Sequence, residues 1–123
     1  MSEDRNDKHI GLQRVLMAMG ASLKGARYVF IHESAFRQEL FLAAIAILCS
    51  LFFLNDWFSL IAVMSSWLLV LIVEVLNTAI ETIVDRISLE RHPLSGAAKD
   101  LGSLAVALSL INAFAWSIYA VVL

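Results

Sequence analysis

The chain has 123 residues, of which 60% are hydrophobic, and its mean hydropathy is +0.80. Soluble domains contain about 45–50% apolar residues, and so short a chain cannot hide this much apolar surface in a water-soluble core. The composition therefore predicts a single integral membrane domain. The net charge of −2 argues against a polyanion-binding surface, and we expect no nucleic-acid partner.

Residues 1–30 form the first predicted element. Apolar residues recur there at helical spacing, at Val15, Met19, Leu23, Ala26 and Phe30. The basic residues Arg14, Lys24 and Arg27 accompany this series. The pattern is typical of a helix that lies in the membrane interface on the cytoplasmic side. We expect no removable signal peptide, because the first residues mix acids and bases.

Three longer apolar segments follow, and each has about the 20 residues that a spanning helix needs. They predict transmembrane helices over residues 33–54, 57–85 and 97–122. The connection at Asn55 and Asp56 is so short that the first two helices should form an antiparallel hairpin. Pro93 disfavours helix at the residue before it, so Ser95 is the expected N-cap of the third span. The predicted fold is an all-α membrane protein, a helical bundle with a surface helix.

The lysines and arginines predict the orientation. All nine lie before or at the beginning of the first span or around the second connection, and the turn at Asn55 and the C-terminus have none. Cytoplasmic loops of membrane proteins carry an excess of basic residues. The N-terminal region and the second connection are therefore expected in the cytoplasm, and Leu123 on the other side.

The second span carries a polar stripe of four residues, Glu74, Asn77, Glu81 and Asp85. At about 100° per residue, their directions around the helix are roughly 0°, 300°, 340° and 20°. A carboxylate in a spanning helix costs about 2.5–3.5 kcal/mol on insertion scales, so three on one face indicate a functional site. Hydrogen bonding between helices is the structural alternative, although Asn or Ser would provide it without charge.

The depth of the stripe predicts a pocket that opens to the cytoplasm. Asp85 and Arg86 mark the boundary, and the helix back to Glu74 covers about 16 Å, roughly half of the hydrocarbon thickness. The other half, residues 57–73, has three serines as its polar groups. A proton-coupled transporter would need a polar path across the whole membrane, which argues against that function. The charged stripe argues against a non-catalytic assembly subunit.

Further charged residues lie at the cytoplasmic ends of the other spans, Glu33 and Arg37 at the first, and Lys99 and Asp100 at the third. Carboxylates supply hard oxygen ligands for Mg²⁺, and basic residues hold phosphate oxygens. Together with a base for the attacking hydroxyl, these are the requirements of phosphoryl transfer. Interfacial ion pairs without a catalytic role are the alternative. The chain has neither a GxxxxGK[ST] loop nor a GxGxxG segment, so a nucleotide would use a different kind of surface.

Three segments resemble the prokaryotic diacylglycerol kinase family. They are Glu33-Ser-Ala-Phe-Arg-Gln-Glu39, Val73-Glu-Val-Leu-Asn-Thr-Ala-Ile-Glu-Thr-Ile-Val-Asp-Arg86 and Ser95-Gly-Ala-Ala-Lys-Asp-Leu-Gly-Ser103. The similarity covers nearly the whole chain after Ile10, and the pattern E-x-x-N-x-x-x-E-x-x-x-D followed by A-K-D is its most specific part. It implies a homotrimer of three-span protomers with shared active sites. It also implies a bacterial inner-membrane location, with a cytoplasmic N-terminus and a periplasmic C-terminus.

The resemblance further implies that the protein phosphorylates 1,2-diacylglycerol to phosphatidate with ATP and Mg²⁺. It makes Glu74 the candidate general base, with Asn77 orienting nearby groups, and Glu33 and Glu81 the metal ligands. The expected nucleotide-binding residues are Arg14, Glu33, Glu81, Asp85, Glu90, His92, Lys99 and Asp100. The expected contacts with the lipid substrate are Arg14, Ala35, Arg37, Glu74 and Ser103.

Two features keep the substrates open at this point. Small and aliphatic residues at positions 21–23 replace an aromatic residue of the family pattern, which argues against adenine stacking on the surface helix. An undecaprenol kinase is the nearest alternative, because the same phosphate site could serve a different lipid pocket. The Phe36-Arg-Gln-Glu39 segment resembles the diacylglycerol branch more closely.

Overall fold

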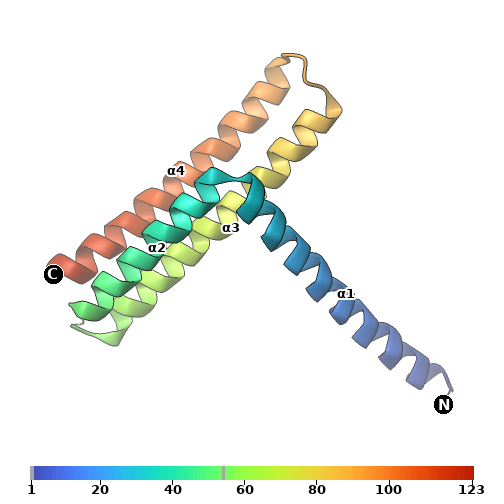
Figure 1. Cartoon of the computed structure of the whole chain (residues 1–123), viewed down its shortest axis with the longest axis horizontal. Coiled ribbons are helices and arrows are strands. Elements are labelled where there is room, and N and C mark those ends of the chain that lie inside the picture. Colours follow the sequence, from blue (N-terminus) through green and yellow to red (C-terminus); the bar gives the residue numbers. More distant parts are fainter. Residues whose placement is uncertain (1, 54) are drawn as a thin grey trace. The chain divides into compact units, whose positions relative to one another are not determined.

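The computed structural model describes residues 2–53 and 55–123, with side chains from Ile10 onwards. These residues form four helices, α1 (Ser2–His32), α2 (Ser34–Phe52), α3 (Trp57–Ile87) and α4 (Pro93–Val122), and no strand (Figure 1). The predicted all-helical fold is confirmed. Met1 and Leu54, the predicted first residue of the surface segment and last residue of the first span, lie outside the described residues.

The chain divides into two compact units, one that ends at Glu33 and one that begins at Ser34. The first unit is the helix α1, which exposes many large apolar side chains, among them Leu12, Leu16 and Leu23. Near its C-terminal end the rings of Tyr28 and His32 stack with their centroids 4.3 Å apart. A helix with so much exposed apolar surface suits the boundary between water and lipid.

The second unit contains the three helices that are long and apolar enough to cross a membrane. In this unit α3 packs against both α2 and α4, most extensively against α4. The turn between α2 and α3 lies at the same end as the C-terminus, and the connection between α3 and α4 lies at the other end (Figure 1). The arrangement agrees with the predicted antiparallel hairpin of the first two spans.

Asp56 explains why α3 begins directly after the short turn. Its side chain accepts a hydrogen bond from the backbone N–H of Ser59 at 2.7 Å and another from the Ser59 hydroxyl at 3.0 Å. An N-cap carboxylate of this kind satisfies a donor that the first helical turn leaves unpaired. The cap therefore lets the chain reverse within a few residues and enter the next span at Trp57.

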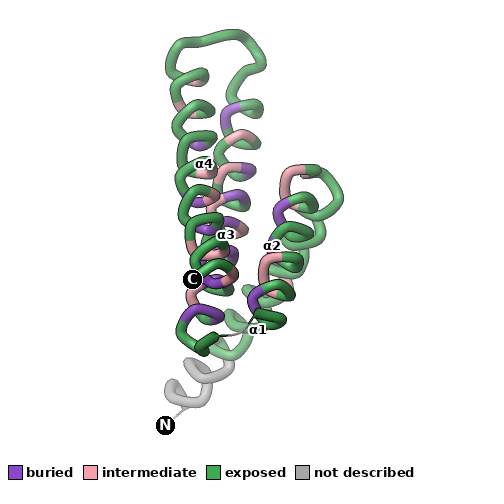
Figure 2. Tube along the Cα trace, turned by 90° about the vertical axis from the view of Figure 1, so that its left-hand side faces the viewer, coloured by how far each residue is buried: buried purple, intermediate pink, exposed green. Residues whose placement is uncertain are grey.

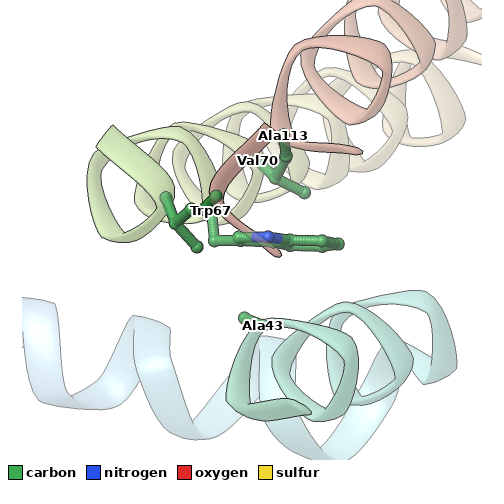
Figure 3. Close-up of a cluster of buried hydrophobic side chains, with 6 residues drawn as sticks. Ala43, Trp67, Val70 and Ala113 are labelled. Atoms are coloured by element: carbon green, nitrogen blue, oxygen red, sulfur yellow. The ribbon is translucent and has the colours of Figure 1, made fainter. Parts of the chain in front are cut away.

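Trp67 is the largest fully buried side chain and joins the three helices of this unit. Its indole ring lies between α3 and α2, opposite Ala43, with Val70 and Ala113 nearby (Figure 3). The indole N–H donates to the Ser117 hydroxyl at 2.9 Å, which ties α3 to α4. This contact satisfies the polar end of an otherwise apolar core, as a buried tryptophan requires.

Buried positions occur along both α3 and α4 (Figure 2). Those of α4 are small residues, whereas α3 carries most of the large buried side chains. The buried residues of α4 are Gly102, Ser109, Ala113 and Ala120. Small residues let two membrane helices approach closely and gain van der Waals contact. The outer faces expose large apolar side chains, including Phe41, Leu68 and Ile111, which suits a lipid environment.

The start of α4 differs from the prediction. The helix begins at Pro93 with His92 as N-cap, and the His92 Nδ1 accepts a hydrogen bond from the backbone N–H of Leu94 at 3.1 Å. The expected N-cap Ser95 is wrong, since it lies inside the first turn. Proline is well suited to the first helical position, because its fixed φ is helical and the N–H that it lacks would be unpaired there.

Candidate active site

The polar stripe of α3 runs from the buried middle of the helix to its exposed end. Glu74 is 4% exposed, Asn77 and Glu81 are half-buried, and the Asp85 side chain is 48% exposed. Helix geometry puts these residues on one face, because they are three or four positions apart. The stripe therefore extends from the buried Glu74 carboxylate within the bundle to the exposed Asp85 at the predicted cytoplasmic end.

Glu39 of α2 is a buried residue of this region to which the sequence analysis assigned no role in the site. It is 6% exposed, and its side chain hydrogen-bonds to that of Glu74 across the packing of α2 on α3. The signal was present in the sequence, since Glu39 lies inside the predicted span 33–54 and a carboxylate there carries the same insertion cost as Glu74. The deep end of the site is thus a pair of acidic side chains from two helices.

Three buried polar atoms around this pair have no hydrogen-bond partner among the described residues. They are Glu39 Oε2, Asn77 Oδ1 and Thr78 Oγ1. A buried polar atom without a partner costs about 1–3 kcal/mol, so each of these atoms needs an explanation. The atoms come from both α2 and α3 and provide hydrogen-bonding capacity next to Glu74.

An ion pair joins α3 and α4 at the exposed end of the stripe. Lys99 Nζ lies 2.7 Å from Asp85 Oδ1, and its charge also interacts with the carboxylate of Glu81. The two side chains of the pair are 44% and 48% exposed, so solvent screens the pair and it adds little to stability. Its main consequence is geometric, because it holds an ammonium group beside two carboxylates of the stripe.

A cavity of about 460 Å³ lies beside this ion pair, where the connection between α3 and α4 covers the helix ends. Its charged and titratable lining residues are Asp85, Glu90, Arg91, His92 and Lys99. The connection is shaped by local hydrogen bonds, including one from the Glu90 backbone N–H to the Ser88 hydroxyl at 3.0 Å. The volume lies within the range of about 300–1,000 Å³ that is typical of small-molecule sites.

This cavity brings together four of the predicted nucleotide-binding residues, Asp85, Glu90, His92 and Lys99. Asp100 and Ser103, also predicted, are exposed on α4 and do not line it. Ala35 and Arg37 lie in the first turn of α2. Sequence reasoning overlooked Arg91, although it stands between two predicted residues, Glu90 and His92.

The remaining predicted residues, Arg14 and Glu33, belong to the first unit. Arg14 is exposed on α1, and Glu33 is half-buried directly after it. Within residues 2–53 and 55–123, no group of three or more His, Cys, Asp or Glu side chains is arranged to hold a metal ion. The proposed metal pair Glu33 and Glu81 comes from the motif alone and stays a prediction.

Comparisons with known proteins agree with these features. Residues 20–121 match the family described as prokaryotic diacylglycerol kinase. A relative named diacylglycerol kinase from Escherichia coli (strain K12) is 46% identical over 103 residues, which cover 84% of each chain. Relatives of the same name from Haemophilus influenzae and Pseudomonas aeruginosa are 46% and 48% identical, and the matches cover 87% and 85% of their chains. The chain therefore belongs to the prokaryotic diacylglycerol kinase family.

Proposed function

We propose that this protein transfers the terminal phosphate of ATP to the hydroxyl of 1,2-diacylglycerol, with Glu74 as the general base, and so makes phosphatidate. The observation that carries the proposal is the buried carboxylate of Glu74 on the same helix face as the charged residues beside the cavity. The eleven residues from Glu74 to Asp85 cover about 16 Å of helix. A lipid hydroxyl can enter that depth from the bilayer, whereas ATP reaches the exposed end from water.

The chemistry assigns a separate task to each part of the stripe. The lipid oxygen forms a bond to the terminal phosphorus, its proton passes to the Glu74 carboxylate, and the bond between that phosphorus and the leaving ADP oxygen breaks. The Asn77 amide, one turn from Glu74, orients the reacting groups. Glu39 holds the Glu74 carboxyl from α2. Base catalysis of this kind is typically worth about 10²–10⁴ in rate.

Charged residues at the exposed end would bind the nucleotide. The proposed ATP site uses the cavity residues Asp85, Glu90, His92 and Lys99, with Arg14 and Asp100 added from the family motif. The Lys99 ammonium is held at 2.7 Å from the Asp85 carboxylate. Phosphate oxygens of ATP would take the place of this carboxylate as hydrogen-bond acceptors of the ammonium group.

Glu33 and Glu81 would hold Mg²⁺. Carboxylate oxygens are the hard ligands that Mg²⁺ prefers, and both side chains are half-buried, which suits a carboxylate that must stay accessible to an ion. When bound, the ion neutralises the negative charge of the phosphates. The chain itself contributes the two carboxylates and the Lys99 charge that interacts with Glu81.

The proposal includes a shared site in a homotrimer, in the bacterial inner membrane, with a cytoplasmic N-terminus and a periplasmic C-terminus. The unpaired buried atoms of Glu39, Asn77 and Thr78 support it, because a lipid substrate or a neighbouring protomer could supply their hydrogen bonds. Arg14, Ala35, Arg37 and Ser103 are the proposed further contacts of the lipid substrate.

A phosphate-transfer assay tests this proposal. Purified protein in lipid bicelles with labelled ATP and Mg²⁺ should label diacylglycerol much faster than undecaprenol. Glu74→Gln keeps the size and hydrogen bonding of the side chain but removes the proton acceptor, so kcat should fall by about 10² or more while ATP affinity changes little. Faster labelling of undecaprenol would transfer the proposal to the alternative lipid, and near-normal turnover of Glu74→Gln would exclude Glu74 as the base.

A further inference from the structure

Gly102 of α4 differs from every other glycine on which the structure reports. It is buried in the packing of α4 on α3, and a Cβ atom built there would overlap the side-chain oxygen of Asn77 and lie 3.2 Å from its Cγ. A Cβ atom at Gly11, Gly20, Gly25 or Gly96 would have no neighbour within 4 Å. The space that a side chain would fill at position 102 is therefore occupied by the amide of Asn77.

The Asn77 amide is confined by this packing rather than by a hydrogen bond at its oxygen. Asn77 Oδ1 is buried, and no hydrogen-bond partner for it exists within the described part of the chain. Glycine is unfavourable in a helix interior compared with alanine, because it loses more backbone entropy on folding. A glycine at a packed position of α4 therefore needs a reason, and the close approach of Asn77 provides one.

We propose that Gly102 is a positioning residue of the phosphoryl-transfer site. Because it has no side chain, the Asn77 amide packs directly against α4 and is held in place there. This inference rests on the function proposed above for Asn77 and Glu74. Asn77 is three residues from Glu74 on the same stripe, and Gly102 is three residues from Lys99 on α4. A methyl group at position 102 must displace the amide or separate the two helices, and either change moves the groups around Glu74.

The expected effect is large for so small a change. A misplacement of about 1 Å in an active site can cost about 10²-fold in rate. We expect Gly102→Ala to lower kcat about 10- to 100-fold, with KM for ATP within about twofold of the original because the exposed cavity does not include Gly102. Gly11→Ala is the matched control, since the same methyl group meets open space there, and it should leave kcat unchanged.

A second measurement separates this role from general damage to the fold. Thermal unfolding of Gly102→Ala should show a lower Tm than the original protein, whereas the same substitution in an Asn77→Ala background should not lower Tm further, because the overlapping amide is absent. If Gly102→Ala alone fails to assemble, the double variant should assemble. An unchanged kcat in Gly102→Ala, or an equal loss of Tm in both backgrounds, would overturn the inference.

The two proposals fail in different ways. If the original protein does not phosphorylate diacylglycerol, the proposed function falls, whatever the variants do. If the original protein is active and Gly102→Ala matches it, the proposed function stands and the role of Gly102 falls.

Discussion

At the scale of single residues, the site depends on side chains that the bilayer would normally exclude. Glu39 and Glu74 are both more than nine-tenths buried, and they meet across two helices. Residues of this kind are retained for function rather than for stability.

Glu39 provides a prediction at this scale. Glu39→Ala removes the group that holds the Glu74 carboxyl, so kcat should fall at least about tenfold, on the scale of a lost orienting contact. Glu39→Gln keeps the shape and can still hydrogen-bond to Glu74, so its kcat should fall less. The measurement is steady-state turnover with saturating lipid and ATP.

The neighbouring Gln38 is the control for Glu39, because it is exposed on the same turn of α2. Gln38→Ala should leave turnover unchanged. Normal turnover of Glu39→Ala would show that Glu74 needs no support from α2.

At the scale of elements, α3 holds carboxylates at different degrees of burial. α3 carries the buried Glu74, the half-buried Glu81 and the exposed Asp85. Because one helix face runs from the buried middle of α3 to its exposed end, the proposed base Glu74 and the proposed metal ligand Glu81 lie on one element.

The proposed metal ligands give the prediction at this scale. Glu33→Gln and Glu81→Gln keep the packing but remove hard anionic ligands, so the Mg²⁺ concentration needed for half-maximal turnover should rise about tenfold or more for each. Titration of activity with Mg²⁺ at constant ATP measures this requirement, and size-exclusion chromatography checks assembly. An unchanged Mg²⁺ requirement in both assembled variants would remove them from the metal site.

At the scale of the whole molecule, the positions of the basic residues predict the orientation in the membrane. The connection between α3 and α4 carries basic residues and covers the cavity, whereas the turn at Asn55 and Asp56 has none. The positive-inside rule therefore predicts that this connection and the proposed ATP site beside it face the cytoplasm.

Thiol labelling tests this orientation. In a Cys49→Ala background, a membrane-impermeant probe should label Arg91→Cys only when the cytoplasmic face of sealed vesicles is exposed, and Asn55→Cys only from the opposite face. Labelling of Arg91→Cys from the periplasmic side alone would reverse the topology and displace the proposed ATP site.

The sequence by itself determined the helical membrane fold, the short hairpin turn and the polar stripe. The reason is that these features depend on residues close in the chain. Apolar length predicts a span, and the period of 3.6 residues decides that Glu74, Asn77, Glu81 and Asp85 share a face. The family motif added roles for these residues without any knowledge of how the helices pack.

Only the tertiary structure decided which faces meet between helices. The contact of Glu39 with Glu74, the space that Gly102 leaves for Asn77 and the start of α4 at Pro93 were not predicted. Contacts between helices depend on the sizes of side chains on two elements at once, and a small residue on α4 has no meaning until the amide opposite it is known. The periodicity of one helix does not determine which side chains of two helices fit together. The contacts of Glu39 with Glu74 and of Gly102 with Asn77 could therefore be found only in the packed structure.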